Sequence, residues 1–206
     1  MLTVFLAALG ALLPITNPLG AVAAYAGLTG NLEPAEVKRQ AVRTAVYVAA
    51  ILTVFALFGS LVLEAFGIGL PALQIAGGIV VAHSGFGMIS PRQDFTDAER
   101  EHARTKTDVS FSPMALPLIA GPGAIGVVIA LSARHAHADD RVGIVLAVLA
   151  VSVLIGLVLR YGTPLVDRLG PTGIGALVRI IGFLILAIGV ELIVHGLLAG
   201  IPGLAS

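Results

Sequence analysis

Apolar residues occur along this 206-residue chain in six long runs, not in the narrow stripes that mark a helix on the surface of a soluble protein. A bilayer core of about 30 Å needs roughly 20 apolar residues in a helix, and each run is close to that length. The runs cover residues 2–29, 41–63, 69–90, 113–132, 142–161 and 174–198. The pattern predicts an all-α integral membrane protein with six transmembrane helices.

The composition indicates that most side chains are surrounded by membrane lipid. Hydrophobic residues make up 57% of the chain and charged residues 12%, whereas a soluble domain has about 25% charged residues. The formal net charge of zero argues against nucleic-acid binding, and the absence of cysteine excludes disulfides and thiolate chemistry. The first run lacks a basic start and is too long for a cleaved signal peptide, so we expect a retained span.

Lysine and arginine residues predict the orientation, because they concentrate in cytoplasmic loops. Arg134 and Arg141 lie on one side of the predicted spans, and Arg179 lies just inside the sixth span. The other nine share the opposite side: Lys38, Arg39, Arg43, Arg92, Arg100, Arg104, Lys106, Arg160 and Arg168. We therefore expect residues 91–112 to form a cytoplasmic loop, with both the N- and C-termini outside.

The two halves of the chain resemble each other. Residues 14–29 match residues 117–132 at an offset of 103, and residues 73–77 match residues 178–182 at an offset of 105. Each half has three spans, an odd number, so the second copy must be inserted upside down. The sequence predicts a first three-helix repeat at 1–90, the cytoplasmic loop at 91–112, and a second, inverted three-helix repeat at 113–206.

The best-matching segments are also the least able to form continuous helices. Pro14 and Pro18 in the first span, and Pro117 and Pro122 in the fourth, each remove an N–H group and bring a ring against an earlier carbonyl. In hydrocarbon such a break survives only where protein or a water-filled cavity covers the freed backbone groups. We expect helices 1 and 4 to be broken. Simple kinks between packed helices are the alternative interpretation.

Broken helices at matching depth can form a binding site. Half-helices beginning near Gly20 and Gly123 would offer N–H groups to an anion such as a carboxylate. The Thr16 hydroxyl and Asn17 amide, with freed carbonyls, could hold an ammonium group or a cation. An amino-acid zwitterion suits these two poles. The predicted substrate-binding residues are Thr16, Asn17, Gly20, Gly121 and Gly123.

Ionisable residues inside a span are functional candidates by default. Glu191 and His195 lie four residues apart on one helical face and could form a proton relay. The alternative is an interfacial His195, with Glu191 paired to it or to a neighbouring chain. His83 and Ser84 are expected to make hydrogen bonds in helix packing. The loop at 135–140 has metal-ligating residue types but lies in a hydrated turn, so no metal site is predicted.

Several motifs resemble the MarC family of bacterial and archaeal inner-membrane proteins. They include Pro14-Ile-Thr-Asn-Pro-Leu-Gly, Gln74-Ile-Ala-Gly-Gly, Met114-Ala-Leu-Pro-Leu-Ile-Ala-Gly-Pro-Gly and Arg179-Ile-Ile-Gly-Phe. The resemblance implies a multi-pass protein of the cytoplasmic membrane and, from some members, transport of glycine- or alanine-like neutral amino acids. Two positions depart from the family pattern. Gln74 stands where arginine is usual, and Glu191 stands where glutamine is usual.

Together, these features predict a secondary transporter of small neutral amino acids, with alternating access around a midplane site and H⁺ or Na⁺ as the coupling ion. No other cofactor is expected, and the partners are the substrate and membrane lipid. Glycines at 77, 78 and 85, and at 182 and 189, indicate either close internal packing or a homo-oligomer contact.

Three other functions are weighed against transport of amino acids. A channel resembling aquaporins would need a second Asn-Pro, but Gly121-Pro122 lacks the asparagine. An enzyme is disfavoured because no nucleophile elbow or metal motif is present. A drug exporter would need aromatic surfaces, but aromatic residues make up only 5% of the chain.

Overall fold

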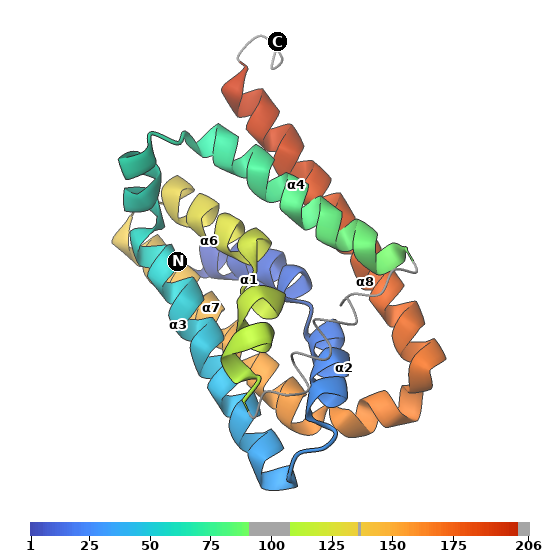
Figure 1. Ribbon diagram of the computed structural model, residues 1–206. Coiled ribbons are helices and arrows are strands. Elements are labelled where there is room, and N and C mark those ends of the chain that lie inside the picture. The colour runs from blue at the N-terminus through green and yellow to red at the C-terminus, as the bar shows by residue number, and fades with distance from the viewer. Residues whose placement is uncertain (91–107, 136, 202–206) are drawn as a thin grey trace.

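A computed structural model describes residues 1–90, 108–135 and 137–201, and these residues form helices and no strands (Figure 1). The chain folds in the order α1 (Leu2–Thr16), α2 (Pro18–Thr29), α3 (Pro34–Phe66), α4 (Leu70–Ile89), η1 (Ser110–Ile119), α6 (Pro122–Arg134), α7 (Ala138–Tyr161) and α8 (Thr163–Gly200). Helix α8 is interrupted at Gly170, where φ is 62°. The all-α prediction is confirmed for the described part of the chain, whereas the predicted loop at 91–112 lies mostly outside it.

The described residues contain five helical segments that are long and apolar enough to cross a membrane: Leu2–Thr29, Pro34–Phe66, Leu70–Ile89, Ala138–Tyr161 and Thr172–Gly200. Helices η1 and α6 meet at a bend of 61° and make a sixth segment if they are counted as one span. These segments coincide with the six apolar runs. The helices end on two sides of the protein. The α2–α3 side is the one where α2, α4 and α7 end, and the opposite side is the one where α1 and α7 begin.

The first span is interrupted at one residue. Asn17 adopts the left-handed conformation (φ 43°, ψ 67°) and separates α1 from α2. Pro14 lies inside α1, while Pro18 is the first residue of α2, where its missing N–H would have no helical partner in any case. The expected interruption is therefore present, but the conformation of Asn17 makes it, and Pro18 starts the next helix.

The second interrupted span departs further from an α-helix. Helix η1 is of the π type, and its last amide bond runs from the Ala120 N–H to the Ala115 carbonyl at 2.9 Å. Leu116, which precedes Pro117, has extended dihedral angles (φ −125°, ψ 131°), as residues before proline commonly do. Gly121 is also extended, and Pro122 begins α6 as Pro18 begins α2.

Helices α4 and α8 pack side by side through their glycines (Figure 1). A Cβ atom on Gly85 would lie 2.4 Å from the Leu186 amide nitrogen, and one on Gly189 would lie 2.4 Å from the Ala82 amide nitrogen. The backbones therefore touch directly, and the two helices are antiparallel. Of the two interpretations of the glycine faces, the structure shows internal packing.

The remaining helices form a tight bundle around a core of apolar side chains, including the fully buried Leu12, Val48 and Ile155. Helix α7 crosses α3 where a Cβ on Gly156 would lie 2.9 Å from the Ala45 methyl carbon. It also follows α1, because the Met1 carbonyl lies against Gly143. Since α1 and α3 run in opposite directions, α7 is parallel to α1 and antiparallel to α3.

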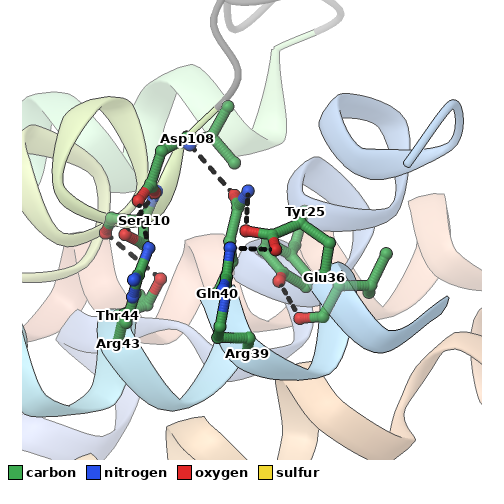
Figure 2. Close-up of polar contacts among 10 residues, drawn as sticks. Tyr25, Glu36, Arg39, Gln40, Arg43, Thr44, Asp108 and Ser110 are labelled. Atoms are coloured by element: carbon green, nitrogen blue, oxygen red, sulfur yellow. Dashed lines mark hydrogen bonds and ion pairs between the residues drawn. The ribbon is translucent and has the colours of Figure 1, made fainter. Parts of the chain in front are cut away.

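A polar cluster on the α2–α3 side fixes the start of η1 against α3 (Figure 2). The fully buried Gln40 accepts a hydrogen bond from the Val109 amide at 3.0 Å, and Thr44 donates one to the Ser110 carbonyl at 3.1 Å. Arg43 and Asp108 form an ion pair at 2.8 Å. Because η1 leads directly into the second interruption, these bonds position that interruption relative to α3.

Asp108 is held as a carboxylate by this cluster. Burial, the largest single influence, raises its pKa, but hydrogen bonds from the Ser110 hydroxyl and amide, together with Arg43, bring the pKa below the ordinary value of 3.8. A lowered pKa stabilises the folded protein above the pKa of the unfolded chain. That contribution is lost as the pH falls through the folded-state pKa.

Candidate functional site

A cavity of about 700 Å³ lies where the two interruptions meet α4 and α8. This volume falls within the range of small-molecule sites. The lining comes from five parts of the chain. They are Ile15 of α1, Asn17 with one face of α2, the second half of α4, the turn between η1 and α6, and the first half of α8. The lining residues are Ile15, Asn17, Gly20, Ala23, Ala24, Gly27, Leu28, Val80, Val81, Ser84, Met88, Pro117, Leu118, Ile119, Gly121, Pro122, Gly123, Ala124, Ile174, Gly175, Val178 and Ile185.

The cavity extends from the two interruptions toward the α2–α3 side. From the interruptions its lining follows α2 as far as Leu28, α4 as far as Met88 and α8 back to Ile174, all toward the α2–α3 side. On the opposite side α4 and α6 close together. A Cβ on Gly123 would lie 2.7 Å from Val81 Cγ2, and the backbones of Gly77 and Gly126 touch one turn further on. Helices α4 and α6 are therefore in contact beyond the two interruptions.

The N-terminus of α6 presents unpaired backbone amides to this cavity. The first amide of α6 that bonds within the helix is that of Ile125, to the Gly121 carbonyl at 3.0 Å, and no side chain caps the end. Within the described residues, the amides of Gly121, Gly123 and Ala124 have no hydrogen-bond acceptor, and all three residues line the cavity. The aligned peptides of this 13-residue helix add a partial positive charge there. Such an end binds anions.

The N-terminus of α2 differs because its own side chain caps it. Asn17 Oδ1 accepts a hydrogen bond from the Gly20 amide at 3.0 Å, while Nδ2 points toward Met88 Sδ at 3.7 Å. A Cβ on Gly20 would lie 2.1 Å from Asn17 Nδ2, so a larger residue there would require the Asn17 side chain to shift. The first interruption therefore offers a side-chain amide to the cavity, and the second offers backbone N–H groups.

Four of the five predicted binding residues, Asn17, Gly20, Gly121 and Gly123, line the cavity. Thr16 does not. It is buried, and its hydroxyl donates to the Leu12 carbonyl at 2.9 Å and approaches the Leu13 carbonyl at 3.2 Å. This threonine satisfies the end of α1, a common use of a hydroxyl in a helix. Its predicted contact with substrate has no support in its position.

Several cavity residues were not expected from the sequence. Ser84 was expected to serve in helix packing, yet it lines the cavity together with Met88 and Ala124. Gly20, Ala23, Ala24 and Gly27 line one face of α2, at spacings of three and four residues. That stripe of small residues was a usable sequence signal. Ser84 carried none, because its orientation depends on which face of α4 meets α8.

Among the described residues, the cavity lining contains no charged side chain. The polar side chains in this described lining are those of Asn17 and Ser84. Glu191 and His195 approach each other at 3.3 Å, as their spacing predicted. They lie on a face of α8 turned away from the cavity, with side chains 66% and 48% exposed. His83 is also exposed and outside the lining.

The turn before α7 contains the residue types that raised the question of a metal. Asp140 contacts the N-terminal ammonium group at 3.1 Å and His135 Nδ1 at 3.7 Å. Among the described residues, no group of three or more His, Cys, Asp and Glu side chains could hold a metal ion.

These features define a class: a helical membrane protein with a cavity between two interrupted spans, lined among the described residues by uncharged side chains. The chain belongs to the MarC family of integral membrane proteins, whose family model matches residues 2–201. The inner membrane protein MarC of Citrobacter koseri is 38% identical over 200 residues, covering 91% of this chain and 90% of the relative. MarC proteins of Salmonella paratyphi A and an Escherichia coli strain are 36% identical with the same coverage. No solved structure matches the chain.

Proposed function

We propose that the protein is a secondary transporter of small neutral amino acids, of the size of glycine or alanine, in the cytoplasmic membrane. The observation that carries the proposal is the cavity in which unpaired α6 amides and the Asn17 side chain meet, with no charged side chain among its described lining residues. A zwitterion brings its own two charges, so a site without charged side chains matches it in net charge.

In the proposed complex the substrate carboxylate binds the amides of Gly121, Gly123 and Ala124. The ammonium group faces Asn17 Oδ1, which retains a second lone pair beside its bond to Gly20, and the Ser84 hydroxyl. Val81 and Ile185 supply apolar walls for a short side chain. Hydrogen bonds to charged groups contribute about 1.5–3 kcal/mol each. A few such bonds are enough for specific binding in a cavity that has both polar groups and apolar walls.

Alternating access would follow from an inverted repeat. Antiparallel packing of α3 with α7 and of α4 with α8 supports a repeat of residues 1–90 in 113–206, because corresponding helices of inverted copies run in opposite directions. The lysine and arginine distribution makes the α2–α3 side cytoplasmic, so the cavity faces inward. Opening outward would separate α4 from α6 at Gly77 and Gly126 and close the cavity near Leu28.

Two competing functions receive less support. A drug exporter would stack large ligands on aromatic rings, and the lining has none among the described residues. An open channel would need a continuous passage, and the contact of α4 with α6 at Gly77 and Gly126 offers none between these two helices. Coupling to H⁺ or Na⁺ remains part of the proposal. Glu191 and His195 lie outside the cavity, so their position gives no support to a role for this pair in ion coupling.

Counterflow in proteoliposomes tests the proposal. Vesicles preloaded with unlabelled alanine should accumulate labelled alanine or glycine transiently, without an ion gradient. Gly123→Val should abolish this exchange because its side chain would meet Val81 and cover the amides of α6. Gly10→Val is the matched control, since a Cβ there meets nothing within 4 Å. Absence of counterflow for every small neutral amino acid, or exchange unaffected by Gly123→Val, would contradict the proposal.

A further inference from the structure

The face of α8 that points away from α4 and the cavity carries an apolar seam interrupted by an acidic residue. The glycines at 182 and 189 face α4, and Val178 and Ile185 face the cavity. On the far side, exposed residues recur at helical spacing: Ile180, Leu184, Ala187, Glu191, Val194 and Leu198. Positions 184, 191 and 198, with 187 and 194, have the seven-residue spacing of helices that pack on each other.

Glu191 lies near mid-membrane depth. The antiparallel contact places Gly78 of α4 against the Gly189 carbonyl and Ile193, so Glu191 is level with Gly78. Helix α4 has 20 residues and is about 30 Å long, which just spans a bilayer core. Gly78 is close to the middle of α4. A carboxyl group at this depth, with its side chain 66% exposed, would therefore face lipid hydrocarbon in a single chain.

Among the described residues, Glu191 is the one acidic residue exposed in the middle of a span, although His83 of α4 and Arg179 of α8 are exposed ionisable residues too. Exposed positions in the middle of α3 and α7, such as Phe58 and Val153, are apolar. Among the described residues, the other acidic side chains lie at helix ends or in connections. His195 contacts Glu191 from the next turn, but both side chains stay half exposed or more. An ionisable pair facing lipid is costly unless a further surface covers it.

We propose that a second copy of this chain covers the seam, with α8 packing against α8 of the other copy. Two copies in the same membrane orientation bring identical residues to the same depth, so the Glu191–His195 pair of one copy meets the same pair of the other. The acceptor of each pair can then bond the donor of the other. Ala187 allows the helices to approach closely, and a polar residue in an apolar seam fixes the register. This proposal does not depend on the transported substrate.

The absence of cysteine from the sequence makes cross-linking a direct test. Val194→Cys on the seam and Val153→Cys on the exposed face of α7 form a matched pair, because both positions are exposed and apolar. In native membranes, oxidation with iodine should link Val194→Cys into a species of twice the chain mass, while Val153→Cys stays monomeric. Equal linking of both variants, no linking of either, or a product with a different protein would overturn the proposal.

Three further variants test the contacts within the seam. Ala187→Phe should abolish the Val194→Cys cross-link by keeping the helices apart, and a persistent cross-link would overturn the proposed packing. Glu191→Leu should raise the dissociation constant in lipid, measured by energy transfer on dilution of labelled protein, by about three- to tenfold, the range typical of interhelical hydrogen bonds. Glu191→Gln keeps a hydrogen-bonding group and should stay within twofold of the parent. Equal association of Glu191→Leu and the parent would contradict the role of Glu191.

Discussion

Replacing Asn17 separates its structural role from its proposed role in binding. Asn17→Ala removes the bond to the Gly20 amide, and loss of such a cap costs about 1 kcal/mol. It also places alanine in the left-handed region that Asn17 occupies at φ 43°, which costs about 1–2 kcal/mol more. Asn17→Gly has no left-handed penalty and loses only a few tenths of a kcal/mol as a cap. We therefore expect Asn17→Ala to lower the free energy of unfolding by about 2–3 kcal/mol and Asn17→Gly to change it little.

Binding should follow a different order. If Asn17 contacts the ammonium group, both variants lose the same hydrogen bond of about 1.5–3 kcal/mol, so affinity should fall about 10- to 150-fold in each. The assay is the thermal shift of purified protein in nanodiscs over a titration of alanine, which gives stability and affinity from one experiment. Parent-like affinity in Asn17→Gly would refute the contact with substrate. Equal stability of the two variants would refute the account of the interruption.

Three further outcomes are expected. Asp108→Asn should reduce the loss of thermal stability that the parent shows below about pH 3.8, because protonation of the low-pKa Asp108 carboxylate removes its stabilising contribution there. The same loss in variant and parent would show that the Arg43–Asp108 cluster does not anchor η1. Glu191→Gln should keep the parent's pH–rate profile for transport, since Glu191 lies outside the cavity; a shifted profile would revive the proton relay. A reporter active only in the cytoplasm, fused after Ser206, should be silent, whereas activity would reverse the topology.

The spans and their interruptions could be predicted because they depend on local chemistry. Apolar length decides whether a helix can cross a bilayer, and that length is legible in the sequence. Pro18 and Pro122 mark the interruptions because proline is accepted at the start of a helix and disfavoured in its interior. The detailed cause was less accessible. Whether Asn17 takes a left-handed conformation depends on the bond its side chain makes to Gly20 after the turn has formed.

The composition of the cavity could be predicted only in part because it depends on helix rotation. Thr16 and Asn17 are neighbours, yet one bonds back into α1 and the other faces the cavity. The direction of each follows from where α1 ends, which the sequence defined only to within a few residues. Ser84 faces the cavity because Gly85 faces α8, and the glycines alone left internal packing and oligomer contact equally open.

The two interruptions differ in a way that gives the proposed site its direction. At the first, Asn17 already bonds the third amide of α2 through its own side chain, which lowers the capacity of that end for an external anion. At the second, Gly121 occupies the corresponding cap position and has no side chain, so the amides of α6 stay available. Two equivalent ends would bind the carboxylate of a zwitterion equally well and would therefore allow two opposite orientations of the substrate. In the proposed complex, unequal ends place the carboxylate at α6 and the ammonium group at Asn17. One orientation of an amino acid would then be favoured, which a carrier needs if it is to distinguish the side chain.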